Sequence, residues 1–479
     1  MSDSMFQWRK DEESVLYPFR KFMAGDVALL TQFVLAFIVV LFHAYVPGAL
    51  FFGILLTLVL LLSDDVVSAF PTFMMALCFL IQAQNSYNQF IIYLPFLFVP
   101  TFAGVMHAVV YKNPYKTKMG SLFVPMVIVS IVDILGGLGT ITAKEFFSTT
   151  SLSYMFALGF MIVIIYWAFS GHISPGKNYT DHMDDRIAKL FCAVAAFLLL
   201  SVLEAYAANW SAFTAHPGIL YLQWRNNACT LLMIALPFTF YMALKHFSYI
   251  ILSFGSMLAM LLSGSRGGLI LGGIEFVFLL IVYYLFDREH RTVINWVVGS
   301  LFVILAFCIP RLMDFMSYTS GRFTSMSQYS VRIGLWRRSI KDFLTNPIFG
   351  RGLGYMGNRD IHPSKTATLC WYHSSLPQVW GSFGLCGLAA YGYQFHARMN
   401  LLRENHSLFG RTVLASFFGL ELMSLVNPGI FAPVYLVIIT VLFIILEQYS
   451  FPNMEVKVTF TDPEEPAEEP CDVGRHEMA

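Results

Sequence analysis

Two arginines and one histidine stand where the chain passes between polar and strongly apolar segments. Arg266 lies in the run Ser263-Gly-Ser-Arg-Gly-Gly268, Arg225 lies in Gln223-Trp-Arg-Asn-Asn227, and His373 comes just before an apolar segment. A guanidinium group binds a phosphate through two parallel hydrogen bonds. A neutral imidazole accepts a proton near neutral pH. These residues therefore favour the binding of a phosphorylated ligand and the removal of a proton from a hydroxyl group.

Each of the three residues also has an ordinary structural interpretation. An arginine at a membrane boundary often only anchors a helix at the headgroups, and a lone histidine is usually a surface or structural residue. The small residues around Arg266 permit a tight turn before a helix, whose first amide groups would add to phosphate binding. We therefore expect Arg266 to bind phosphate, with Arg225 as a second ligand at the same face. His362 competes with His373 for the role of base.

The histidine closes a basic segment, residues 311–376, which carries nine Lys or Arg against three acids. Its glycines Gly350, Gly352 and Gly354 predict a compact turn that brings the backbone near a substrate. The run Gly352-Leu-Gly-Tyr-Met-Gly357 matches a dinucleotide fingerprint, but no strand precedes it, so we reject that function. Upstream, Ile333, Trp336, Ile340 and Phe343 recur at helical spacing. They predict an amphipathic helix at the membrane surface that ends at Asn346-Pro347.

The composition places this segment in a membrane protein. Of 479 residues, 57% are hydrophobic and 13% are charged, about half the charged share of a soluble domain, and the mean hydropathy is +0.63. We therefore predict an all-α, polytopic bundle. Its spans are assigned on the rule that a transmembrane helix needs roughly 20 apolar residues, or somewhat fewer. Seven scattered cysteines without a CxxC pair indicate neither a disulfide framework nor a metal site. The expected spans number about fourteen, near 26–45, 47–62, 66–82, 90–111, 121–142, 150–170, 187–208, 226–244, 247–263, 267–286, 293–310, 377–397, 409–426 and 431–449.

Alternate connections between these spans are rich in Lys and Arg, which predicts cytoplasmic loops and two cytoplasmic termini. The basic segment then lies outside, as loops longer than about 60 residues can. The predicted organisation is a cytoplasmic segment (1–24), eleven spans (25–310), the outer catalytic loop (311–376), three spans (377–450) and a disordered acidic tail (451–479). Four acids fall within predicted spans and could form an ion path or hydrogen bonds between helices: Asp133, Glu204, Glu275 and Glu421.

Taken together, residues 220–400 resemble the bacterial O-antigen ligase and polymerase superfamily. The resemblance rests on Ser-Gly-Ser-Arg266-Gly-Gly, on Arg332-x3-Trp336, on Asn346-Pro347-x2-Gly350-x-Gly352-x-Gly354, and on His373 before a glycine-rich helix. The first 200 residues are similar only in being a series of helices. The family usually has Asn after the histidine, whereas this chain has Ser374.

The resemblance implies a multi-pass inner-membrane transferase of the GT-C-like type, inverting, independent of metals and without a cofactor. Its donor would be a glycan on undecaprenyl diphosphate, and its acceptor a sugar or surface carrier at the outer face of the membrane. His373 would be the general base, and Arg266, Arg225 and Arg332 would hold the diphosphate. Trp336, the loop glycines and Ser374 would support the loop. Besides these substrates, membrane lipids would be its partners, and nucleic acid would not.

Two other functions stay open at this point. A polymerase would join lipid-linked repeat units, and differs from a ligase only in its acceptor. A transporter or flippase of lipid-linked or anionic solutes should show inverted repeats and broken helices near the midplane. The concentration of polar residues in one outer loop favours the transferase.

The predicted orientation can be tested by cysteine labelling. In a cysteine-free background, cysteines placed at Ser325 and Ser364 should react with a membrane-impermeant maleimide, because both lie in the outer loop. Reaction only after the cytoplasmic membrane is permeabilised would overturn the orientation.

Overall fold

The computed structural model describes residues 14–82, 98–111, 120–136, 152, 155–175, 177–180, 182–215, 218–307, 326–353, 372–427 and 429–452. This part of the chain consists of helices and their connections and has no strand. The predicted all-α class is thereby confirmed. Gly354, His362 and nearly all of the acidic tail lie outside the described residues.

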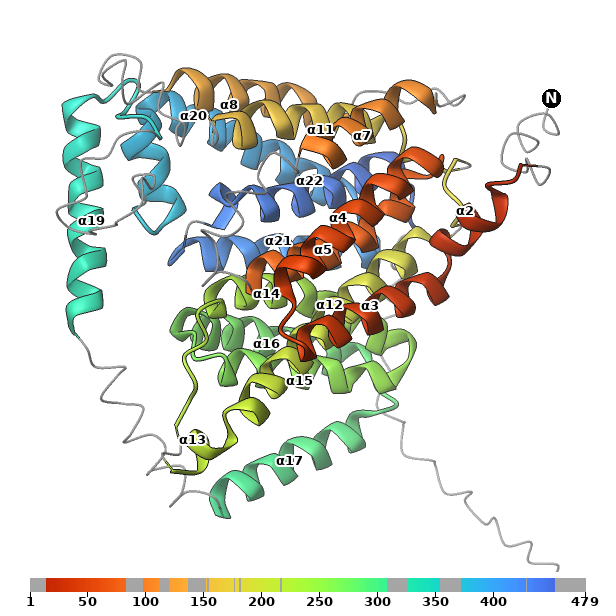
Figure 1. The fold of residues 1–479 in the computed structure, drawn as a ribbon. Helices are drawn as coiled ribbons and strands as arrows, with labels where there is room; N and C mark the ends of the chain where they lie inside the picture. The colour runs from red at the N-terminus through yellow and green to blue at the C-terminus, as the bar shows by residue number, and fades with distance from the viewer. Residues whose placement is uncertain are drawn as a thin grey trace, which may run out of the picture.

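The helices mostly lie side by side (Figure 1). They are α2 (Tyr17–Ala24), α3 (Asp26–Leu41), α4 (Tyr45–Leu62), η1 (Val66–Ala69), α5 (Phe70–Gln82), α7 (Phe98–Val110), α8 (Phe123–Leu135), η4 (Met155–Phe160), α11 (Met161–Ser170), α12 (Met183–Ala208), α13 (Trp210–Ala215), α14 (Arg225–Lys245), η5 (Phe247–Tyr249), α15 (Ile250–Leu262), α16 (Arg266–Phe286), α17 (Arg291–Phe307), α19 (Met326–Thr345), α20 (Ser375–Glu404), α21 (Leu408–Ser424), η6 (Gly429–Phe431) and α22 (Pro433–Gln448).

Several of these helices are long and apolar enough to cross a membrane. Among the described residues, α4, α12, α14 and α16 meet that requirement singly, and α2 with α3, bent by 71°, would make a fifth span. Shorter apolar helices accompany them, such as Phe123–Leu135 and Pro433–Gln448. The membrane character of the chain is confirmed, while the number of about fourteen spans stays a prediction.

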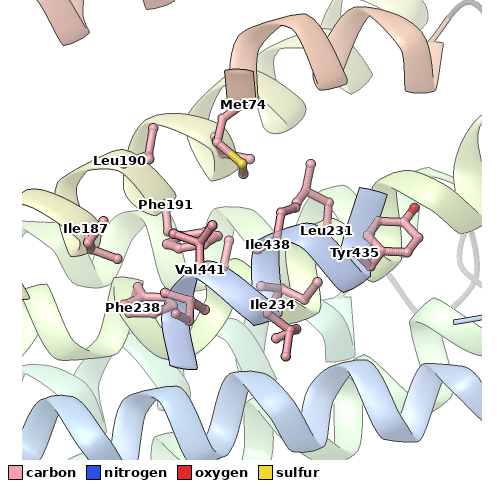
Figure 2. Close-up of a cluster of buried hydrophobic side chains, with 14 of the residues drawn as sticks. Met74, Ile187, Leu190, Phe191, Leu231, Ile234, Phe238, Tyr435, Ile438 and Val441 are labelled. Atoms are coloured by element: carbon pink, nitrogen blue, oxygen red, sulfur yellow. The ribbon is translucent and has the colours of Figure 1, made fainter. Parts of the chain in front are cut away.

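Helix α14 occupies the centre of the bundle and is buried on all sides, as expected of a helix that is apolar all round. It packs against α12, α15, α16 and α21. The rings of Phe191 and Phe238 stack at 4.4 Å between α12 and α14. Because lipid tails are as apolar as these side chains, close packing rather than transfer from water holds such helices together. Figure 2 shows the cluster where α5, α12, α14 and α22 meet, with Met74, Ile187, Leu190, Phe191, Leu231, Ile234, Phe238, Tyr435, Ile438 and Val441 labelled.

Helix α20 is broken at Gly384, which has a φ of +61°. In an unbroken helix the next two N–H groups would donate to carbonyls four residues earlier. Instead, the N–H of Leu385 donates to the carbonyl of Pro347, at 2.8 Å. The N–H of Cys386 donates in the same way to the carbonyl of Ile348, at 3.1 Å. Both donors released by the break are therefore bonded to a segment from outside the helix.

The two released carbonyls are bonded to the same segment, residues 347–352, which we call the strap. The carbonyl of Gly381 accepts from the N–H of Arg351 at 2.9 Å, and that of Ser382 accepts from Gly352 at 2.7 Å. The strap thus replaces two helical hydrogen bonds with four bonds of its own. Because unpaired backbone groups are costly away from water, this pairing makes the break sustainable in an apolar bundle.

Glycine is required at two positions for this pairing. A Cβ atom at Gly350 would lie 2.4 Å from the backbone nitrogen of Phe383, and one at Gly384 would lie 2.5 Å from the carbonyl oxygen of Pro347. Both glycines also have positive φ, which other residues adopt only at a cost. The predicted compact turn at Gly350 and Gly352 is present and brings the backbone against α20; its approach to a substrate stays a prediction.

Helix α19 precedes the strap and runs across the bundle helices rather than along them (Figure 1). It ends at Thr345, before the predicted Asn346-Pro347 stop. Its buried side, with Leu335, Ser339 and Asp342, faces the protein, and the indole N–H of Trp380 on α20 donates to the Ser339 hydroxyl at 2.8 Å. The predicted apolar residues lie largely exposed, at 49% for Ile333, 41% for Trp336 and 50% for Ile340. An exposed apolar stripe suits contact with lipid.

The substitution Gly384→Ala should lower the thermal stability of the purified protein in detergent. The new methyl group would strain the backbone by about 1–3 kcal/mol and would also strike the strap. Gly392→Ala in the second half of the same helix is the matched control, since a Cβ there meets nothing within 4 Å. It should leave the melting temperature unchanged or raise it slightly, because alanine favours helix by up to about 1 kcal/mol. Equal melting temperatures for the two variants would show that the break does not depend on glycine.

Candidate functional site

The two predicted arginines stand at the first residues of two neighbouring helices, Arg225 on α14 and Arg266 on α16. The hydroxyl of Ser265 accepts from the N–H of Gly268 at 3.1 Å and so caps α16. The same hydroxyl donates to the amide oxygen of Asn226 on α14 at 2.8 Å. One serine thereby fixes the two helix starts relative to each other.

The turn before Arg266 is as tight as its small residues predict. Gly264 has a φ of +77°, and a Cβ atom there would lie 2.8 Å from the carbonyl oxygen of Leu220. The carbonyl of Ser263 accepts from the N–H of Leu222 at 3.4 Å. The segment that leads into α14 therefore runs alongside the turn that leads into α16.

Positive charge collects where the two helices begin. Arg225 donates through Nη1 to the carbonyl of Leu222 at 2.8 Å, and its guanidinium lies 5.4 Å from the centre of the Tyr221 ring. Arg266 begins the neighbouring helix, which is joined to α14 through the bond from Ser265 to Asn226. Two guanidinium groups and two helix N-termini are an arrangement that favours a group with several negative charges, such as a diphosphate.

His373 stands at the beginning of α20 in an unusual backbone conformation. Its φ is +53°, a left-handed conformation that is rare outside glycine, and its side chain is half-buried. Such a conformation costs of order 1–3 kcal/mol and persists only where the surroundings enforce it. Ser374 follows in extended conformation as the N-cap residue of α20 and is buried.

The residue before the histidine is fixed by α19. Tyr372 is fully buried, and its hydroxyl donates to Oδ2 of Asp342 at 2.7 Å. Nε of Arg351, on the strap, lies 3.8 Å from Oδ1 of the same carboxylate. Burial raises the pKa of Asp342, while the Tyr372 hydrogen bond and the charge of Arg351 act against that rise. Sequence reasoning missed this group, because Tyr372 and Asp342 stand 30 residues apart.

The turn after α21, together with η6, contacts both α16 and the middle of α20. A Cβ atom at Gly267, next to Arg266, would lie 2.9 Å from a methyl group of Val426. A few residues further on, the ring of Phe431 lies 6.2 Å from that of Phe383, one residue before the break in α20. The structure therefore brings the starts of α14 and α16 together, and it connects α16 with the middle of α20, ten residues after His373. A site shared by the arginines and His373 stays a prediction.

The remaining predicted residues lie on α19 and in the strap. Arg332 and Trp336 lie one turn apart on α19, which packs against α20. Gly350 and Gly352 lie in the strap. The contact of Arg332 with a diphosphate stays a prediction, as does the supporting role of the others.

Three of the four acids in predicted spans have partners on other segments, two of them on other helices. The hydroxyl of Tyr391 donates to Asp133 at 2.7 Å, Glu421 interacts with the charge of Arg398, and Glu204 lies 3.7 Å from His43. Such contacts favour a structural role for these acids, as bonds within the helix bundle, over an ion path. Glu275 differs, because within the described residues both of its carboxylate oxygens are buried without a hydrogen-bond partner.

Residues 249–392 match the family model described as O-antigen ligase. The resemblance to the O-antigen ligase and polymerase superfamily is confirmed over this segment. The O-antigen ligase segment runs from α15 into α20 and contains Arg266, Arg332, the strap and His373, while Arg225 lies before it. No curated protein matches the chain.

The arginine pair can be tested by binding of undecaprenyl diphosphate, with uncharged undecaprenol as the ligand control. Arg225→Ala or Arg266→Ala should weaken binding roughly ten- to hundredfold, since a hydrogen bond to a charged group contributes about 1.5–3 kcal/mol. Lysine at either position should restore binding only in part, because it lacks the planar fork.

Arg291→Ala is the matched control for this test. Arg291 is also the first residue of its helix, and its guanidinium lies 5.1 Å from the centre of the Tyr284 ring. It stands beyond the opposite end of α16, so binding should be unchanged. Equal losses in Arg291→Ala and Arg266→Ala would mean that charge in general, rather than this pair, attracts the ligand.

Proposed function

We propose that the protein transfers a glycan from undecaprenyl diphosphate to an acceptor sugar or surface carrier at the outer face of the cytoplasmic membrane. The O-antigen ligase segment and the membrane-capable helices support glycan transfer by a membrane protein of the ligase and polymerase type. The observation that carries the proposal is that Arg225 and Arg266 begin two helices whose starts are bonded to each other. An arginine that only anchors a helix at the lipid headgroups does not require a second arginine at the same place.

The chemistry assigns one task to the arginines and another to the histidine. The acceptor hydroxyl loses its proton to the imidazole of His373 while its oxygen forms a bond to the anomeric carbon. The bond from that carbon to the diphosphate oxygen breaks, and the electron pair leaves with undecaprenyl diphosphate. Attack opposite the leaving group inverts the anomeric configuration. Arg225 and Arg266 stabilise the charge that grows on the diphosphate, because preorganised donors act strongly in a poorly hydrated site.

One assay distinguishes a ligase from a polymerase, and a transferase from a flippase. Purified protein is incubated with a defined undecaprenyl-diphosphate glycan, with a lipid A-core acceptor, with a second lipid-linked repeat, or alone. A product on the lipid A-core indicates a ligase, and a lengthened lipid-linked glycan indicates a polymerase. A flippase, for which the broken α20 is a compatible feature, would move the donor across a vesicle membrane without forming a glycosidic bond.

His373→Ala should lower the turnover number by about 10²–10⁴-fold, the usual contribution of a general base. Binding of undecaprenyl diphosphate should be retained, because the arginines and not the imidazole hold it. The wild-type rate should fall on acidification, since a protonated imidazole cannot accept a proton. The residual rate of His373→Ala should not show that fall.

Two other histidines serve as controls for this assignment. His396 is exposed on the same helix, α20, and His396→Ala should keep wild-type turnover. His362→Ala should also retain most activity. Loss of turnover in His362→Ala together with full turnover in His373→Ala would transfer the role of base to His362.

A further inference from the structure

The backbone of His373 is left-handed, and something nearby must hold it so. Tyr372 precedes it and makes three contacts that fix its position. Its hydroxyl bonds to Asp342 at 2.7 Å, and its N–H donates to the side chain of Gln378 at 3.1 Å. Its ring fills the space above Gly381, where a Cβ atom would lie 2.7 Å from a ring carbon. A residue held at its backbone, its ring and its hydroxyl leaves the next residue little freedom.

The partner of the Tyr372 hydroxyl is itself immobilised. Asp342 is 2% exposed on the buried side of α19. Arg351 approaches its second oxygen at 3.8 Å, and the N–H of Arg351 is bonded to α20 through the carbonyl of Gly381. The carboxylate therefore lies between the tyrosine before the histidine and the strap that is paired with the broken helix.

We infer that Tyr372, bonded to Asp342, is a positioning residue that fixes the His373 imidazole for proton transfer. This inference rests on the proposed function, in which His373 is the base. Arg351 supports the same carboxylate from the strap. Tyr372 touches no reacting atom in this account; it acts only through the residue that follows it.

The alternative is a purely structural role, in which Tyr372 only stabilises the contact between α19 and α20. A second hydrogen bond makes that same contact, from Trp380 to Ser339 at 2.8 Å, and neither of its residues adjoins His373. Ser339→Ala is therefore a matched control, since it removes one α19–α20 hydrogen bond from a fully buried position without touching the histidine.

A double-mutant cycle with His373 separates the two roles. Tyr372→Phe keeps the ring and removes the hydroxyl, and it should lower kcat by up to about 100-fold, as misplacement of a reacting group by about 1 Å can do. The KM for the lipid-linked donor should change little, and Ser339→Ala should keep wild-type kcat. In a His373→Ala background Tyr372→Phe should cause no further loss, because residues that act as one unit are not additive. Equal fold-losses in both backgrounds would overturn the inference.

The conservative variant of the acceptor gives a second test. Asp342→Asn keeps an oxygen that can accept from the Tyr372 hydroxyl, so kcat should stay within a few-fold of wild type. Asp342→Ala removes that acceptor and should resemble Tyr372→Phe. If the asparagine variant lost as much activity as the alanine variant, the hydroxyl bond would not be the positioning element.

Chemical modification of His373, which does not depend on glycan transfer, tests the inference separately from the proposed function. The half-buried His373 should react faster with diethyl pyrocarbonate in Tyr372→Phe than in wild type or Ser339→Ala, as followed by mass spectrometry of the peptide. A faster reaction with no loss of turnover in His373→Ala would refute the base and leave the positioning intact. An unchanged reaction rate with an unchanged kcat in Tyr372→Phe would refute the positioning alone.

Discussion

The pairing between the strap and the broken helix α20 is the constraint on which the candidate site depends. Gly384 interrupts the helix, and the four backbone groups released there bond to residues 347–352. Because such groups cannot be left unpaired in an apolar bundle, strap and break require each other. The strap follows directly on α19, so the same four bonds hold the crossing helix against the bundle and place Asp342 over Tyr372.

The two halves of the site are consequently supported in different ways. Arg225 begins the most deeply buried helix of the bundle and is joined to the start of α16 through Asn226 and Ser265. His373 begins a broken helix whose place is set by side-chain contacts from several directions, including Tyr391 to Asp133 on α8. A charged leaving group needs donors that do not move, whereas a base must match the position of its acceptor. In the proposed function, an arginine pair fixed at two joined helix starts and a histidine held through its neighbours would meet these two needs.

Sequence reasoning reached what local patterns encode. Apolar runs predicted the helices, small residues predicted the turn before Arg266, and Asn346-Pro347 predicted the end of α19. The break at Gly384 could not be read in this way, since a glycine in an apolar helix indicates close packing as readily as a kink. The bond from Tyr372 to Asp342 joins residues 30 positions apart. Contacts of that kind depend on how the strap packs against α20, and the periodicity of apolar residues in the sequence does not predict this.

The charges at the two ends of α14 have different surroundings, which bears on the proposed diphosphate site. At its last turn Lys245 lies among the carboxylates of Asp184 and Asp185, so opposite charges neutralise each other within the protein. At its first residue Arg225 lies next to the start of α16, where Arg266 is a second cationic residue. Like charges held together destabilise a fold, and the cost is largest where water is scarce. A bound anion with two charged groups reverses the sign of that interaction, because each guanidinium then lies beside negative charge. In the proposed function, relief of that repulsion would be part of the affinity for a diphosphate.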